Sequence, residues 1–210
     1  MSPVALKNTS MDRLAIDSME KRSRANLVNS LSGYKSANLL GTINAQGRTN
    51  LALMSSVFHV GANPPLVGLL IRPHSVPRHS LENILDLGEY TLNVVTRDMY
   101  AQAHQTTARY DRDQSEFAAV GLAEEYSPLV KAPYVASSRI KTGLKLIETQ
   151  TLAVNDTVLV IGEIVELLIN EGLMAEDGQL DHHMADTVAV TGLDEYHSAS
   201  SLQRLGYPKP

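Results

Sequence analysis

Short apolar runs, separated by turn signals, set the pattern of the chain from residue 38 onward. Their enrichment in β-branched and aliphatic residues is typical of strands, and six segments show it: 38–43, 49–60, 65–71, 89–95, 142–154 and 156–169. A glycine-containing connection at 44–47 suits a hairpin turn, and the proline pair at 64–65 excludes a central strand at that point. The pattern therefore predicts an antiparallel arrangement of mostly consecutive strands.

Helical spacing is confined to a few segments. Residues 12–31 mix helix formers with spaced apolar positions, which predicts one or two leading helices that end at Gly33. Residues 80–87 have the same spacing, with Ser80 as the expected N-cap and Gly88 as the stop, and residues 99–108 predict another helix. We therefore expect a mainly β fold with helical insertions, which is a small barrel of the α+β type. An N-terminal helical segment would span 1–34, and a single barrel domain would span 35–210.

The segment at 156–169 is apolar on both of its alternating faces. One face carries Val158, Val160, Ile164 and Leu168, and the other carries Leu159, Ile161, Val165 and Leu167. Periodicity alone also allows a helix, but the β-branched residues and Gly162 favour a strand. A strand with two apolar faces needs a cover on its outer side, for which helices or a second subunit are the candidates.

Composition and charge narrow the classes of function. The 210 residues carry a formal charge of −5, which argues against a general nucleic-acid binder. They include no cysteine, which excludes disulfides and thiolate-held metal or iron–sulfur centres, so electron chemistry would need an organic cofactor or a metal held without thiolates. The first residues lack an apolar signal-peptide core, and Glu163 and Glu166 interrupt the longest apolar stretch. We therefore expect a soluble cytoplasmic protein with no membrane partner.

Several common motifs are missing from the sequence. There is no GxGxxG after a strand and no GxxxxGK[ST], so the standard nucleotide-binding motifs are absent. There is also no GxSxG, the motif that carries the nucleophilic serine of many hydrolases. Asp181, His182, His183 and Asp186 could ligate a metal if His182 and Asp186 shared a helix face. We favour a polar loop beside the Asp177-Gly178 turn and expect no metal site, because no further ligands with recognisable spacing accompany these residues.

Cations and hydroxyls gather where the strand at 65–71 ends. Arg72 and Arg78 can bind a phosphate bidentately, Ser75 and Ser80 add donors, and the expected helix would point its free N–H groups at the same place. Glu82 in the first turn argues against an anion there. The sequence leaves two readings open: a phosphate cradle, or a capped helix with solvated arginines.

Ser55 and Ser56 interrupt the apolar segment at 49–60. Adjacent residues of a strand point to opposite faces, so both side chains serve one ligand only if the strand bends. Two readings stay open: one serine contributes its hydroxyl and the other its backbone, or both are buried hydroxyls bonded to neighbouring carbonyls.

At these residues the chain resembles the flavin reductase-like, FMN-binding split-barrel family. The similarity rests on the order and spacing of SLSGYKSANLLGT, TNLALMSSVFHVGANPPL, IRPHSVPRHSLENI and GLDEYHSASSLQRLGYPKP. The resemblance implies a Greek-key split barrel that works as a homodimer with FMN near the subunit interface. It implies that the isoalloxazine lies at the strand around Met54 and that the phosphate lies at 72–80. The implied cofactor-binding residues are Asn50, Met54, Ser55, Ser56, Arg72, Ser75, Arg78, His79 and Ser80.

The resemblance implies an enzyme, an NAD(P)H-dependent flavin reductase that passes hydride from NADH or NADPH through bound flavin. FMN is the expected flavin, with FAD as the alternative. A non-enzymatic FMN-binding electron-transfer protein with a protein redox partner is the second reading, and a structural barrel with an unused flavin site is the third. The flavin supplies the redox chemistry, so we assign no catalytic side chain. His59 and His79 lie near the implied site and could protonate reduced flavin or orient a substrate, with a structural or phosphate-facing role as the alternative for each.

Overall fold

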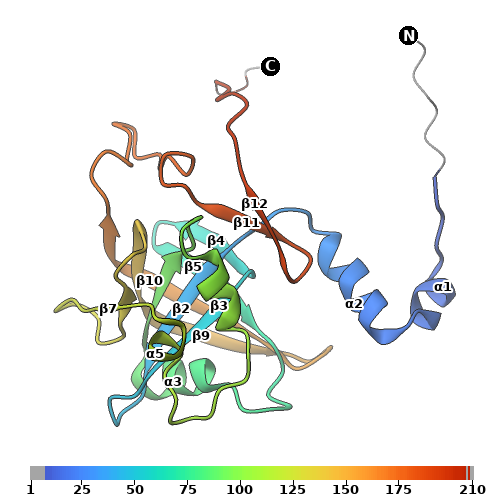
Figure 1. The fold of residues 1–210 in the computed structure, drawn as a ribbon, viewed down its shortest axis with the longest axis horizontal. Helices are drawn as coiled ribbons and strands as arrows, with labels where there is room; N and C mark the ends of the chain where they lie inside the picture. Colours follow the sequence, from blue (N-terminus) through green and yellow to red (C-terminus); the bar gives the residue numbers. More distant parts are fainter. Residues whose placement is uncertain (1–7, 207, 209–210) are drawn as a thin grey trace.

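The computed structural model describes residues 8–206 and 208, and a seven-stranded antiparallel sheet lies at its centre (Figure 1). In order across this sheet, the strands are β3 (Thr49–Met54), β2 (Asn38–Ile43), β6 (Glu89–Val94), β9 (Ile140–Leu152), β10 (Thr157–Ile169), β5 (Pro65–Ile71) and β4 (Val57–Ala62). Two smaller sheets join β1 (Lys35–Ser36), β11 (Val188–Thr191) and β12 (Glu195–Ser198), and β7 (Glu124–Glu125) with β8 (Tyr134–Val135). The helices are α1 (Arg13–Ser18), α2 (Lys21–Ser30), α3 (His79–Leu87), α4 (Tyr100–Gln105) and α5 (Glu116–Val120).

The two edges of the large sheet are neighbours in the chain. β3 and β4 are the edge strands, yet only Ser55 and Ser56 separate them. The sheet therefore has to roll until its edges approach each other at this point, although β3 and β4 are not paired in the part of the chain that the structure describes. The result is an open antiparallel barrel, and the expectation of a mainly β fold with helical insertions is confirmed.

The prediction of one strand over 49–60 is wrong. The segment is divided into β3 and β4, with a bend at Ser55 and Ser56. The physical reason is the rolled sheet: the chain leaves one edge and enters the other, and a continuous extended strand could not do both. The remaining predicted strands all occur, and the helix that the sequence ends at Gly88 does so with Gly88 in the left-handed conformation.

Apolar side chains pack on both faces of the rolled sheet. Inside the barrel, the buried cluster includes Leu40, Tyr90 and Val160, and α3 adds Ile84 to it. On the opposite face of β2 and β3, a second cluster is covered by α4, α5 and the small sheet of β11. Since β2 contributes to both clusters, nearly all of its residues are buried.

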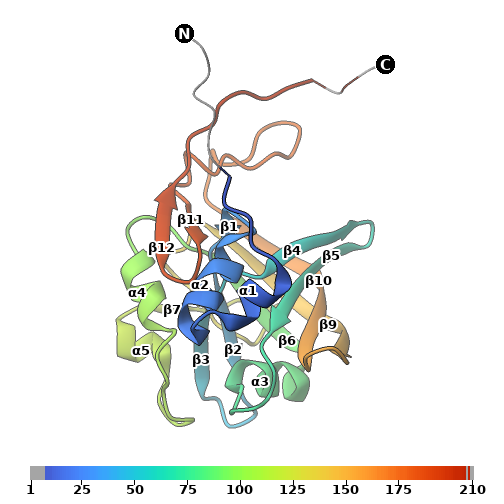
Figure 2. The same ribbon diagram turned by 90° about the vertical axis from the view of Figure 1, so that its right-hand side faces the viewer.

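The outer edge of β3 is bonded to side chains instead of a further strand. The N–H of Leu51 donates to Glu116 Oε2 (2.9 Å), and the N–H of Leu53 donates to Thr106 Oγ1 (3.0 Å). Both acceptors come from the α4–α5 region, which lies along this edge (Figure 2). Burial raises the pKa of Glu116, and the N–H groups that bond its carboxylate offset only part of this effect. β3 is therefore held in place by a carboxyl group whose ionisation opposes folding.

Substituting Glu116 with Gln is expected to reduce the pH dependence of stability. A carboxyl whose pKa is raised in the folded state contributes stability that is fully present below its unfolded pKa and is lost as pH rises through the folded value. The free energy of unfolding of the wild type should therefore fall, relative to Glu116→Gln, over the pH range that begins at the ordinary carboxyl pKa of 4.5 and extends up through the raised folded-state value. Urea unfolding of both proteins across this range measures the difference. Parallel pH profiles would contradict the assignment.

The two leading helices lie beside the barrel, outside its core (Figures 1 and 2). Neither α1 nor α2 has a buried residue, and apolar side chains such as Leu14 and Val28 are exposed. The helices at 12–31 that the sequence predicts are present, whereas the division of the chain at residue 34 stays a prediction. Among the described residues, no helix combines the length and the apolar character needed to cross a membrane.

Candidate functional site

The opening of the barrel is the place where the edge strands β3 and β4 approach each other, and serine hydroxyl groups lie there. At the bend between β3 and β4, Ser56 Oγ donates to the carbonyl oxygen of Leu70 (2.8 Å). Ser36 Oγ donates to the carbonyl oxygen of Val57 (3.5 Å), and Asn38 Nδ2 donates to Ser36 Oγ (3.1 Å). The chain bends at Ser55 and Ser56, which is the condition that the sequence sets for both side chains to serve one ligand. The hydroxyl of Ser56 is engaged by the protein itself.

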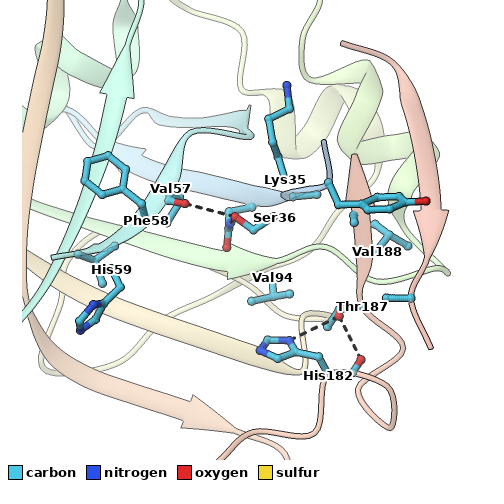
Figure 3. A pocket seen from close by; sticks show the side chains of 15 residues that line it. Lys35, Ser36, Val57, Phe58, His59, Val94, His182, Thr187 and Val188 are labelled. Atoms are coloured by element: carbon cyan, nitrogen blue, oxygen red, sulfur yellow. Dashed lines mark hydrogen bonds between the residues drawn. The ribbon is translucent and has the colours of Figure 1, made fainter. Parts of the chain in front are cut away.

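A pocket of about 440 Å³ lies beside this bend. Its walls come from four places in the chain: 34–38, 57–59 with Val67, Val94, and His182 with 187–189 and Ala199. Figure 3 shows the imidazoles of His59 and His182 along one side of the pocket and Phe58 near the other. Thr187 holds the loop that carries His182, because its Oγ1 donates to the carbonyl oxygen of His182 (3.0 Å) and lies 3.5 Å from Nδ1. The pocket is mainly apolar, with imidazole and amide groups at its margin.

The residues around His182 form a loop, as the sequence favours. Residues 182–186 consist of turns, so His182 and Asp186 do not share a helix face. Asp186 instead pairs with Arg97 (3.2 Å). Among the described residues, no three carboxylates or imidazoles are gathered in a way that could hold a metal ion.

Four cations, Lys35, Arg72, Arg78 and Arg109, lie close enough to influence one another's charge. Burial and then the charge of Arg72 lower the pKa of Lys35, which is at the pocket wall. Burial, Arg72 and Arg109 lower the pKa of Arg78. Within the described residues, none of the four is ion-paired with a carboxylate. A bound anion would relieve this mutual repulsion, which is the arrangement expected of a phosphate site.

The start of α3 differs from the prediction at Ser80. The N-cap is Arg78, and Ser80 is the second residue of the helix, with an exposed fraction of 7%. Its hydroxyl does not cap the helix; it accepts a hydrogen bond from Asn50 Nδ2 (2.9 Å). Glu82 takes the capping role, since its Oε1 accepts from the N–H of Arg78 (3.2 Å). The prediction of Ser80 as N-cap is therefore wrong, and Ser80 instead links α3 to β3.

A family model of the flavin reductase like domain matches residues 31–185, which is more than half of the chain. The chain belongs to this family.

Solved structures extend the comparison. A candidate flavin reductase with a split barrel domain from Shewanella frigidimarina is 50% identical, with a TM-score of 0.93, and the match covers 96% of this chain and 100% of that one. Nitrilotriacetate monooxygenase component B from Bacillus cereus is 18% identical, with a TM-score of 0.84 and coverage of 96% and 100%. Flavoredoxin from Desulfovibrio vulgaris is 22% identical, with a TM-score of 0.73 and coverage of 83% and 92%. The last two likenesses show the fold alone. Together with the topology, the comparisons confirm the split barrel.

In this flavin reductase like domain, the residues expected at the flavin come from two neighbouring regions. Asn50 and Ser80 are in direct contact, Met54 packs against the barrel core, and Ser55 and Ser56 form the bend. Arg72 and Ser75 are exposed on the loop that leads to Arg78, whose Nε donates to the carbonyl oxygen of Pro73 (3.0 Å). His79 opens α3 and is half-buried.

Sequence reasoning missed several polar residues of this region. Lys35 and Asn38 line the pocket, Arg109 is close enough to influence Arg78, and Arg112 bonds to α3. Lys35 and Asn38 lie within the SLSGYKSANLLGT motif, which was the available signal. The loop at 106–115 gives no local signal, because its contacts with α3 exist only in the folded protein.

Proposed function

We propose that the protein binds FMN at the opening of the barrel and acts as an NAD(P)H-dependent flavin reductase. The observation that carries the proposal is the group of four cations, none of which pairs with a carboxylate of the described residues, beside a pocket large enough for part of an aromatic cofactor. The family membership supports flavin as the ligand.

The phosphate would lie at the start of α3. Arg72, Arg78 and Ser75 would supply charge and a hydroxyl, and the first N–H groups of the helix, at His79 and Ser80, would point at the same anion. Ser80 also has a hydroxyl proton to donate, since its oxygen accepts from Asn50. The start of α3 and the loop before it therefore fit a phosphate monoester better than a neutral group.

The isoalloxazine would lie along the bend between β3 and β4. Met54, Ser55 and Ser56 would face the ring through the backbone as much as through side chains, because Ser56 Oγ is already bonded to Leu70. Asn50 would act from β3 through its contact with Ser80. Bound FMN would supply the hydride-accepting ring, while the protein positions it and limits access of water. His59 and His182 line the pocket and would exchange protons with a substrate there.

The absorbance spectrum of the purified protein, followed by anaerobic stopped-flow mixing with NADH and with NADPH, tests this function. FMN, FAD and riboflavin are added in separate titrations. Flavin bleaching by either nicotinamide supports the reductase. Tight FMN that only a chemical reductant bleaches would instead identify an electron-transfer protein with a protein redox partner. Failure to bind any flavin would overturn the proposal.

We further propose a homodimer in which the outer face of β4, β5 and β10 is the interface. Strand register puts Leu70 beside Leu159 and puts Gly68 between Phe58 and Ile161. Phe58 and Leu70 are 42% and 37% exposed, which leaves an apolar surface on the side of β10 that the sequence expects to be covered. Phe58 also lines the pocket, so a second copy on this face would approach the flavin.

Leu70→Glu is expected to convert the dimer to a monomer and to weaken FMN binding. Burying an unpaired carboxylate in an apolar interface costs several kcal/mol, which exceeds what one apolar contact returns. Sedimentation velocity over a dilution series measures the change. Val154→Glu is the matched control, because Val154 is 87% exposed in the β9–β10 turn. A wild-type monomer that retains FMN at all concentrations would contradict the interfacial site.

A further inference from the structure

Arg112 connects a distant loop to the first turn of α3. Its Nη1 donates to Glu82 Oε2 (2.6 Å), and its Nη2 donates to Asn83 Oδ1 (2.8 Å). A longer bond runs from Nη1 to the carbonyl oxygen of His79 (3.4 Å). Asn83 is fixed in turn, because its Nδ2 donates to Thr42 Oγ1 on β2 (3.0 Å) and the residue is 2% exposed. The loop between α4 and α5 is thus fastened to the helix start through three acceptors.

Glu82 is the residue that this connection serves. It lies in the first turn of α3, next to the group formed by Lys35, Arg72, Arg78 and Arg109, and its free carboxylate would repel a phosphate there. The structure engages both oxygens: Oε2 accepts from Arg112, and Oε1 accepts from the N–H of Arg78 (3.2 Å) and lies 3.0 Å from His74 Nε2. The charge of Glu82 is therefore compensated by Arg112 and by the groups at Oε1, whereas the guanidinium of Arg78 bonds to the carbonyl oxygen of Pro73.

We propose that Arg112 is a positioning residue for the anion site: it neutralises and holds Glu82 so that the start of α3 can accept a phosphate group. Arg112 touches Glu82, Asn83 and the His79 carbonyl, and it acts on the ligand only through them. The same loop brings Arg109 close to Arg78. The loop at 106–115 thereby supplies Arg109 to the anion site and Arg112 to Glu82, the acidic residue in the first turn of α3. This inference rests on the proposed binding of FMN.

The expected result follows from the charge balance. In Arg112→Gln, Glu82 is left with one cationic neighbour fewer, so the dissociation constant for FMN should rise on the order of tenfold. Riboflavin shares the ring and ribityl chain but has no phosphate, and its affinity should change by less than about twofold. Adding Glu82→Gln to Arg112→Gln removes the uncompensated charge and should return FMN affinity to within about threefold of the wild type.

Fluorescence titrations with FMN and riboflavin, on wild type, Arg112→Gln, Glu82→Gln and the double variant, make the test. Arg13→Gln is the matched control, since Arg13 also forms one ion pair, with Asp17 (2.7 Å), but both residues lie in α1, outside the barrel core. It should leave both ligands unchanged. If Arg112→Gln fails to fold, Arg112→Lys keeps the charge and should preserve the preference for FMN over riboflavin.

Two results would overturn the proposal: equal losses for FMN and riboflavin in Arg112→Gln, or an FMN loss that Glu82→Gln does not restore. Either would mean that Arg112 only stabilises the helix. Failure of the wild type to bind FMN would instead defeat the proposed function, and the two failures are therefore distinguishable. Wild-type binding with a selective, rescuable loss of FMN supports the assignment of Arg112.

Discussion

Arg78→Ala is expected to bind FMN about ten- to a hundredfold more weakly than the wild type, while riboflavin binding hardly changes. A charge-assisted bond to a phosphate is worth roughly 1.5–3 kcal/mol, and riboflavin has no group to make it. Arg78 is the strongest choice among the cations because it is the N-cap of α3, where the free N–H groups of the helix also point. Its guanidinium is already oriented by the carbonyl of Pro73.

Titrations with the two flavins measure the ratio of their affinities, which cancels any general effect on the fold. Arg13→Ala is a suitable control, since Arg13 pairs with Asp17 within α1 (2.7 Å), outside the barrel core. If Arg78 only stabilised the start of the helix, its removal would weaken both flavins equally and slightly. An Arg78→Ala protein with the wild-type preference for FMN would refute the phosphate assignment.

The strands could be predicted from the sequence because their signals are local. Segments that alternate apolar and polar residues, or that are apolar on both faces, form β2, β5, β6, β9 and β10. The predicted turn at 44–47 is closed by a hydrogen bond from the N–H of Asn44 to the carbonyl oxygen of Arg48. The concentration of arginines and hydroxyls after β5 is also a local property, so the candidate phosphate segment could be found without a structure.

The remaining features depend on contacts between distant segments. The bend at Ser55 and Ser56 follows from the rolling of a sheet whose edges are β3 and β4, which no window of sequence records. Ser80 has the side chain of an N-cap, but tertiary structure gives it Asn50 as a partner and gives the cap to Glu82. Sequence alone makes Glu82 an argument against an anion, because its partner Arg112 lies 30 residues away in the chain.

Gly41→Ala is expected to cost about 3 kcal/mol or more of the free energy of unfolding, which for a marginally stable domain threatens folding itself. A Cβ on Gly41 would lie 2.3 Å from the carbonyl oxygen of Pro133 and 2.4 Å from Thr91 Oγ1. These two atoms are themselves hydrogen-bonded (2.6 Å), and Pro133 belongs to the segment that leads into β8. β2 is held on both sides, by β3 and by β6, so it cannot shift away from the contact.

Gly61→Ala is the matched control for Gly41→Ala. Gly61 is also a strand glycine, but it lies in β4 at the sheet edge, and its nearest neighbour for a Cβ is the carbonyl oxygen of Pro64 at 3.3 Å. We expect this variant to stay within about 1 kcal/mol of the wild type. Urea unfolding followed by far-UV circular dichroism compares the two proteins. A Gly41→Ala protein as stable as Gly61→Ala would mean that the 131–133 segment can move away from β2, and that β2 is less confined than its contacts indicate.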